Sequence, residues 1–369
     1  MSPEAQQESS PERGVAGECQ AAFAARGKRA KRTVRAFKFG GTSLLGAERM
    51  LHAAGLVREA ASDASVAVVV SAMKGVTDRL LGIAGALAAG HASDALREAD
   101  HVFYQHVDVL RELRLDPFAT ERVARELRLL GKDLQQDVAH AARAGAGDPA
   151  LLDRLASYGE RFSARLFSAA LEKCGLHAVP VSSSEFVLTC DTFREARPRL
   201  EETRQRGREI LLPLFEDGLV PVVTGFIGAT PDGRVTTLGR NSSDYSGALV
   251  AHVVDAAELV IWTDVDGIYT ANPHESSEAR LLHELSYDEA HALAASGARV
   301  LHARVLPLAA ETEMVVWVRN TFNPGHRGTR IGPNARGDGF AAPPPPRGCH
   351  NSNNFNNDCS DKFSSRGEA

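Results

Sequence analysis

The chain has 369 residues, of which 43% are hydrophobic and 24% are charged, a composition typical of a folded globular protein. No stretch approaches the ~20 uninterrupted apolar residues that a membrane span needs, and the most apolar run, Val66–Val70, has the length of a strand. The net charge of -5 at pH 7 argues against a general nucleic-acid binder, which usually has a basic surface. We therefore expect a small-molecule partner, and neither nucleic acid nor a membrane.

Residues 1–33 have the composition of a disordered extension. They begin with a mixture of Pro, Glu, Gln and Ser and end with a basic cluster, Arg26, Lys28, Arg29, Lys31 and Arg32. Glutamates in the first stretch and the lack of an apolar segment argue against a cleaved signal peptide. We expect the basic cluster to be a solvated arm.

From residue 34 to residue 332, short apolar segments alternate with long helical ones. This alternation predicts an α/β fold in which βα units build a mostly parallel sheet. The expected strands are Val34–Phe39, Val66–Ser71, His177–Val181, Val220–Thr224, Leu259–Thr263 and Met314–Arg319.

Two further segments of this region have a clear pattern. Between about Ala92 and Cys174, apolar residues recur at spacings of three and four, which predicts helix, and a Gly, Asp and Pro cluster at 145–149 breaks it. Phe226–Thr237 carries Pro-Asp-Gly at residues 231–233, which predicts a hairpin turn.

Residues 333–369 are rich in proline, asparagine and serine and cannot bury a core, so we expect a disordered tail. The cysteines are odd in number and scattered, which indicates neither a disulfide framework nor a CxxC metal site, and so favours a reducing compartment. They are Cys19, Cys174, Cys190, Cys349 and Cys359.

The first expected strand ends in a phosphate-binding pattern. Lys38 supplies positive charge, and Gly40 and Gly41 let the backbone approach an anion closely, with the dipole of the next helix beyond them. In a Walker P-loop the lysine follows the glycines, whereas here it precedes them. The pattern therefore indicates another class of phosphate-binding protein.

Polar residues also follow the other strands. Thr77 and Ser243 are each placed to cap a helix, and Arg240 follows a Leu-Gly pair that would expose a guanidinium able to grip a carboxylate with two hydrogen bonds. Asp264 and Asp266 follow a strand, but the glycine and glutamate positions of a calcium-binding EF-hand loop are not matched.

Five blocks together resemble the aspartokinases of the amino-acid kinase superfamily, over about residues 34–332. They are Lys-Phe-Gly-Gly-Thr-Ser at 38–43, Ser-Ala-Met-Lys-Gly-Val-Thr at 71–77, Ser-Tyr-Gly-Glu at 157–160, Leu-Gly-Arg-Asn-Ser-Ser-Asp-Tyr at 238–245 and Trp-Thr-Asp-Val-Asp-Gly-Ile-Tyr-Thr at 262–270. The resemblance implies a three-layer αβα sandwich with residues 34–332 as the catalytic domain. It also implies transfer of the ATP γ-phosphoryl group to the β-carboxylate of L-aspartate, with ATP and Mg²⁺ as cofactors.

The same resemblance assigns roles to individual residues. Lys38 and Asp244 are implied to be catalytic, although Asp244 could contact either the substrate ammonium or Mg²⁺, and no metal ligand is fixed. The implied substrate-binding residues are Ser71, Thr77, Glu160 for the α-ammonium, Arg240 for the α-carboxylate, Ser243 and Asp244. The implied nucleotide-binding residues are Lys38, Phe39, Gly40, Gly41, Thr42, Ser43, Thr263, Asp264, Tyr269, His274 and Arg299.

The chain departs from the family pattern at two of these positions and at one nearby. His274 stands where arginine is common, Arg299 replaces a lysine that approaches the nucleotide, and Ala303 replaces a proline. Arginine keeps the charge but is bulkier and planar, so nucleotide affinity and turnover are the properties that these departures affect.

The expected function is that of an aspartate kinase, a cytoplasmic homodimer catalysing the first step of lysine, threonine and methionine synthesis. A kinase acting on glutamate or N-acetylglutamate is the alternative within the superfamily, although an acetylated amine offers no ammonium to Glu160. An alternative of another class is a catalytically silent partner subunit that binds nucleotide or aspartate. The ligand-binding ACT modules usual in similar aspartokinases have no counterpart in the sequence, so we expect insensitivity to lysine and threonine.

Overall fold

The computed structural model describes residues 32–144, 148–271, 278–295, 301–302, 304–333 and 335. The expected N-terminal extension and C-terminal tail therefore lie almost wholly outside the described residues, and those two predictions stay predictions. His274, Arg299 and Ala303 also lie outside them.

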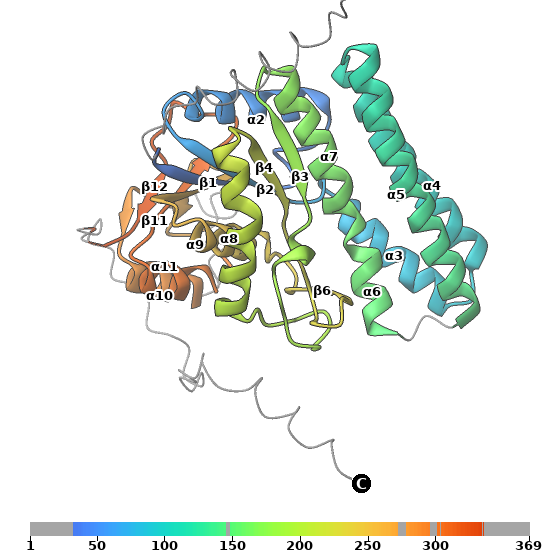
Figure 1. Ribbon diagram of the computed structural model, residues 1–369. Coiled ribbons are helices and arrows are strands. Elements are labelled where there is room, and N and C mark those ends of the chain that lie inside the picture. Colours follow the sequence, from blue (N-terminus) through green and yellow to red (C-terminus); the bar gives the residue numbers. More distant parts are fainter. Residues whose placement is uncertain are drawn as a thin grey trace, which may run out of the picture.

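Eight strands form the central sheet (Figure 1). In their order across it they are β10 (Glu284–Leu285), β12 (Thr329–Ile331), β11 (Val315–Asn320), β7 (Glu258–Thr263), β1 (Val34–Phe39), β2 (Ser65–Val70), β4 (Val220–Thr224) and β3 (Ala178–Val181). All neighbours run parallel except β11 and β12. Each of the six expected strands is present within one residue of its predicted bounds, so the mostly parallel sheet is confirmed.

Both faces of the sheet are buried, as expected of a parallel sheet. Along β2, Val66, Val68 and Val70 belong to one hydrophobic core, while Ala67 and Val69 belong to the other. The first core is covered by α2 (Ala47–Ala60) and α7 (Tyr158–Lys173). The second is covered by α8 (Leu200–Glu216), α9 (Ser243–Val253), α10 (Tyr287–Ala295) and α11 (Val305–Glu311). The three-layer sandwich is therefore confirmed.

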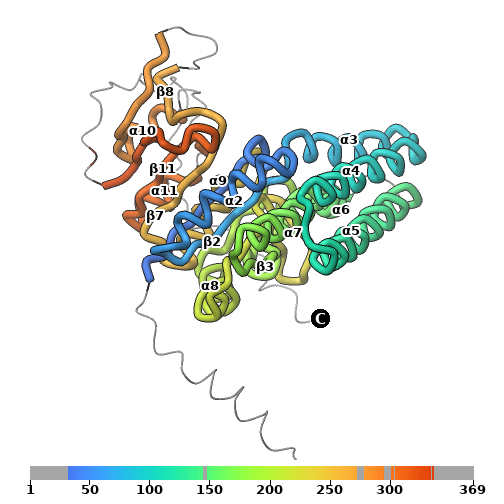
Figure 2. Tube along the Cα trace, turned by 90° about the horizontal axis from the view of Figure 1, so that it is seen from above, coloured from blue at the N-terminus to red at the C-terminus, as the bar shows by residue number. Residues whose placement is uncertain are grey.

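The long helical region forms several helices rather than one. They are α4 (Ala92–Leu113), α5 (Pro117–Ala144), α6 (Pro149–Ala156) and α7, and they are preceded by a separate helix, α3 (Val76–Ala88). Figure 2 shows α3, α4 and α5 beside the sheet, on the side away from α10 and α11. The predicted break falls between α5 and α6, where the Asp148 carboxylate accepts a hydrogen bond from the Ala150 amide at 3.0 Å.

A second break, between α4 and α5, was not predicted. Arg114 adopts a left-handed conformation with φ 49°, and the Asp116 carboxylate then accepts hydrogen bonds from the amides of Phe118 and Ala119, both at 3.0 Å. No glycine marks this turn, so the apolar spacing on either side gave no sign of it.

The predicted hairpin is present. β5 (Ile227–Ala229) pairs antiparallel with β6 (Val235–Thr237), and Gly233 at the tip has φ 84°, which favours glycine. A second antiparallel pair, β8 (Ile268–Tyr269) with β9 (Leu281–Leu282), was not predicted.

None of the helices that the structure describes is both long and apolar enough to cross a bilayer.

Candidate active site

The candidate site is built where four adjacent parallel strands end, at the edge of the sheet where α/β proteins commonly bind ligands. Backbone hydrogen bonds tie the segments after β1, β2 and β4 to one another or to a neighbouring strand. These run from Gly40 N to Trp262 O of β7 at 3.2 Å, from Lys74 N to Gly41 O at 3.0 Å and from Gly225 N to Val70 O of β2 at 2.8 Å. These three segments are therefore held in fixed positions relative to the sheet.

The structure brings Lys38 and Asp244 together. The Lys38 side chain leaves β1 and its Nζ lies 2.6 Å from Asp244 Oδ1 in the first turn of α9. Lys38 is only 7% exposed, and Gly247 lets α9 approach it, since a Cβ at 247 would lie 3.1 Å from Lys38 Cβ. An ammonium group held beside a helix N-terminus is suited to binding an anion there.

The two glycines after Lys38 have different surroundings. A Cβ on Gly41 would lie 2.6 Å from the carbonyl oxygen of Ala72, so only glycine fits against the segment after β2. A Cβ on Gly40 would meet only Trp262 O at 3.6 Å and Lys38 Nζ at 3.7 Å, which are ordinary contacts. Gly41 thus serves packing, while Gly40 leaves room beside the ammonium group.

Phe39 and Ser43 serve the fold with their side chains. Phe39 is fully buried and its ring stacks on Trp262, with centroids 6.2 Å apart. Ser43 is also fully buried, and its hydroxyl is hydrogen-bonded to Thr321 at 2.7 Å. Thr42 is half-buried, so its hydroxyl is the more accessible of the two that the sequence indicated.

Glu160 is buried against the segment after β2, although it lies on a helix where glutamate usually faces solvent. Its side chain is in the first turn of α7, and the residue is 3% exposed. Oε1 accepts a hydrogen bond from the Ala72 amide at 3.0 Å, whereas Oε2 is buried without a hydrogen-bond partner. Burial raises the pKa of Glu160 to about 8, opposed by the Ala72 hydrogen bond and the charge of Lys38.

Arg240 approaches the same region from the chain after β6. Its guanidinium is exposed and lies 2.8 Å from the Asp78 carboxylate in the first turn of α3. Ser71, Thr77 and Ser243 are half-buried in the surrounding segments.

The two predicted helix caps are wrong by one or two positions. Gly75, with φ 86°, occupies the N-cap of α3, and Ser242 occupies that of α9, so Thr77 and Ser243 lie inside the helices. In α3, Gly75, with its left-handed backbone conformation, forms the cap two residues before Thr77, the hydroxyl residue from which the cap was predicted.

The two carboxylates in the segment after β7, Asp264 and Asp266, have different surroundings. Asp266 Oδ1 accepts hydrogen bonds from the side-chain amides of Asn320 at 2.8 Å and Asn323 at 3.1 Å, which fixes the chain after β11. Asp264 is exposed, and Thr263 and Tyr269 are half-buried. Asp264 is therefore the carboxylate of this pair that remains open to solvent.

Several contacts of the site could not be found from side-chain patterns. Ala72 acts through its backbone amide, and Asp78 meets Arg240 only because segments far apart in the sequence converge. A cavity of about 670 Å³ lies elsewhere, lined by α5, α6, α7, β3 and the β5–β6 hairpin, and contains none of the predicted site residues. The Lys38 site is thus distinct from this cavity.

Comparisons with known proteins identify the family to which the chain is similar. The sequence model of the Amino acid kinase family matches residues 34–320. Lysine-sensitive aspartokinase 3 of Escherichia coli is 35% identical over 295 residues, which cover 80% of this chain and 63% of that protein. The chloroplastic aspartokinase 1 of Arabidopsis thaliana is 34% identical over 301 residues, covering 80% of this chain and 51% of that protein.

A solved structure is similar over the same region. The crystal structure of Escherichia coli aspartokinase III in complex with aspartate and ADP has a TM-score of 0.73 and 32% identity, covering 81% of this chain and 64% of that one. A Clostridium acetobutylicum aspartate kinase, at 20% identity and a TM-score of 0.63, shares the fold. The chain spans less than two thirds of the length of each of these relatives.

Proposed function

The chain belongs to the amino acid kinase family, and from that premise we propose that it transfers the γ-phosphoryl group of MgATP to the β-carboxylate of L-aspartate. The product is 4-phospho-L-aspartate. The observation that carries the proposal is the likeness, over 81% of the chain, to a structure whose ligands are aspartate and ADP. We assign this activity to a catalytic domain of residues 34–332.

The chemistry needs positioning and charge neutralisation more than proton transfer. A β-carboxylate is already ionised at neutral pH, so no general base is required. Lys38 stabilises the negative charge on the transferring phosphoryl group, and Asp244 holds the Lys38 ammonium group in place at 2.6 Å. Arg240 binds the α-carboxylate of aspartate, and Glu160 binds its α-ammonium.

The surroundings of Lys38 fit a nucleotide phosphate. Gly40 leaves space next to the ammonium group, and the N-terminus of α9 adds its dipole. Mg²⁺ in kinases is bound mainly by phosphate oxygens and water, with one or two carboxylates, and Asp244 is the carboxylate beside Lys38 that would contribute. In the described part of the chain no three His, Cys, Asp or Glu side chains gather to hold a metal by themselves.

Glu160 discriminates against one of the candidate substrates, N-acetylglutamate. Its buried Oε2 has no hydrogen-bond partner, which suits an ammonium group and not the acetylated amine of N-acetylglutamate. L-Glutamate differs from aspartate by one methylene and is the closer rival. A homodimeric, cytoplasmic enzyme at the first step of lysine, threonine and methionine synthesis completes the proposal.

Trapping of the acyl phosphate with hydroxylamine tests the activity. We expect hydroxamate from MgATP with L-aspartate, and not with L-glutamate or N-acetyl-L-glutamate. Lys38→Met keeps the buried aliphatic stem and should abolish the product, while Lys132→Ala, which removes an exposed lysine of α5, should leave it unchanged. A folded wild-type protein that binds nucleotide but forms no hydroxamate would instead favour the silent partner subunit.

A further inference from the structure

Asp153 is a buried carboxylate that the proposed chemistry does not use. It lies on α6 and is 2% exposed. Oδ2 accepts hydrogen bonds from the backbone amides of Arg194 at 2.8 Å and Thr237 at 2.7 Å, and Oδ1 accepts one from the Thr237 hydroxyl at 3.0 Å. Both oxygens are therefore satisfied, which is how a buried charged group is retained at low cost.

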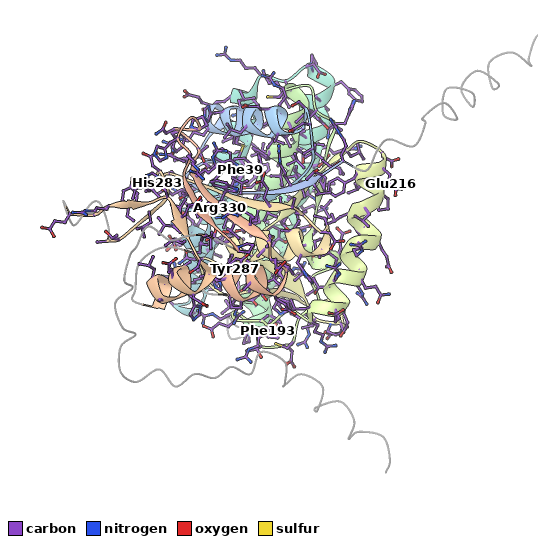
Figure 3. The ribbon with its side chains drawn as sticks, turned by 90° about the vertical axis from the view of Figure 1, so that its left-hand side faces the viewer. Phe39, Phe193, Glu216, His283, Tyr287 and Arg330 are labelled. Atoms are coloured by element: carbon purple, nitrogen blue, oxygen red, sulfur yellow. The ribbon has the colours of Figure 1, made fainter. Side chains whose placement is uncertain are left out.

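These hydrogen bonds join two chain segments that are distant in sequence. The Arg194 segment and the end of β6 also contact each other directly, since the Ala196 amide donates to Thr237 O at 2.9 Å. Phe193, next to Arg194, lies at the lower rim of the molecule in Figure 3. Asp153 thus fixes the point at which the chain leaves β6.

The chain leaving β6 leads to Arg240 within three residues. Gly239 has φ 100°, and a Cβ there would lie 3.7 Å from Arg194 O. The turn at Gly239 therefore packs against the Arg194 segment, which Asp153 holds in place. The Arg240 side chain is 76% exposed and its ion pair with Asp78 lies at the surface. An exposed ion pair contributes little, so the position of Arg240 depends on the backbone of the turn.

We propose that Asp153 is a positioning residue that holds the 237–240 turn so that Arg240 meets the α-carboxylate of the substrate. This inference rests on the proposed function. Asp153 does not itself touch substrate, because both its oxygens are already bonded and it is almost inaccessible. Its effect reaches the substrate through Thr237, Gly239 and Arg240.

A set of variants tests this role by steady-state kinetics. Asp153→Asn can keep all three contacts, since its oxygen can accept from both amides and its amide can donate to the Thr237 hydroxyl, so we expect KM values close to wild type. Asp153→Ala loses them all. At about 1 kcal/mol for a hydrogen bond, we expect the KM for aspartate to rise about tenfold or more, with the KM for ATP within about twofold.

Two more variants separate positioning from loss of stability. Asp148→Ala removes the other aspartate hydrogen bond of α6, to Ala150, and should leave the KM for aspartate unchanged. Thr237→Val removes one of the three bonds without touching the carboxylate, and should raise that KM about fivefold. It also provides the test if Asp153→Ala does not fold.

A double variant decides whether Asp153 acts through Arg240. In an Arg240→Ala background, Asp153→Ala or Thr237→Val should cause no further rise in the KM for aspartate. A further rise of the same size, or an equal loss of affinity for ATP and aspartate, would overturn the positioning role. Wild-type protein that gives no hydroxamate with aspartate would instead overturn the proposed function, so the two failures are distinguishable.

Discussion

Two buried carboxylates on consecutive helices, Asp153 of α6 and Glu160 of α7, differ in how completely their oxygens are hydrogen-bonded. They are 2% and 3% exposed, respectively, and burial raises the pKa of each. Asp153 accepts three hydrogen bonds, which oppose that rise, whereas Glu160 accepts one side-chain bond and leaves Oε2 unpaired. A satisfied buried carboxylate belongs to the scaffold, while an unsatisfied one beside a ligand site is available for binding.

The largest expected effect that separates the two is on activity. Glu160→Gln keeps the acceptor for the Ala72 amide, but unlike Glu160 it cannot release a proton to become the charged partner of the substrate ammonium. A hydrogen bond to a charged group is worth about 1.5–3 kcal/mol, so we expect kcat/KM for aspartate to fall by about 10- to 100-fold. The KM for ATP should change little.

Glu172→Gln is the matched control, because Glu172 lies in the last turn of the same helix and forms a half-buried ion pair with Arg122, away from the site. It should leave kcat/KM unchanged. If Glu160→Gln were as active as this control, the unpaired Oε2 would have no role in binding.

The next largest expected effect is on stability, and it concerns Ala72, whose amide donates a hydrogen bond to Glu160. A methyl group at Gly41 would clash with Ala72 O at 2.6 Å and displace the residue whose amide bonds Glu160. Overpacking of this kind costs about 1–3 kcal/mol, so Gly41→Ala should lower the free energy of unfolding by about that amount in urea titrations.

Gly40→Ala is the comparison variant, since its Cβ would make only ordinary contacts. We expect its stability to match wild type, but the KM for ATP to rise, because the new methyl group would stand beside Lys38 Nζ. Equal destabilisation by both substitutions would mean that the segments after β1 and β2 do not hold Ala72 in the position described.

Protonation of Glu160 gives the third test. Its pKa is raised from 4.5 to about 8 in the folded protein, so between those values the folded state keeps a proton that the unfolded state has lost. Stability from this group is therefore full below about pH 4.5 and is lost as pH rises toward 8, by at most about 1.4 kcal/mol per pH unit. Glu160→Gln should lack this dependence in urea titrations at pH 5, 6.5 and 8, and parallel curves for the two proteins would contradict the buried, protonated carboxyl group.

Much of the fold could be predicted because its signals are local. Apolar β-branched runs bounded by glycine and polar residues marked the six strands, and Gly233 marked the hairpin. The short strands β8, β9, β10 and β12 were missed because two or three residues carry no periodicity. The turn at Arg114 was missed because its left-handed conformation has no glycine to signal it and is followed by the Asp116 cap.

The motifs singled out Lys38 and Asp244, and the structure brings these two residues together; their roles in catalysis stay predictions. The sequence could not show that Glu160 is buried, since its helix face is determined by the approach of Ala72 across the sheet edge. It also could not separate Asp264 from Asp266, two residues apart, because the partners of Asp266 are asparagines more than fifty residues away.

The smallest expected effect is that of removing the surface ion pair of Arg240. It tests whether that ion pair or the backbone turn held by Asp153 positions Arg240. Asp78→Ala removes an ion pair whose side chains are 76% and 72% exposed, so the free energy of unfolding should fall by less than about 1 kcal/mol. The KM for aspartate should stay within about twofold of wild type, because the 237–240 turn and not Asp78 sets the position of Arg240. A rise as large as that expected for Asp153→Ala would reverse this assignment and make the surface ion pair, rather than the buried carboxylate, the element that positions Arg240.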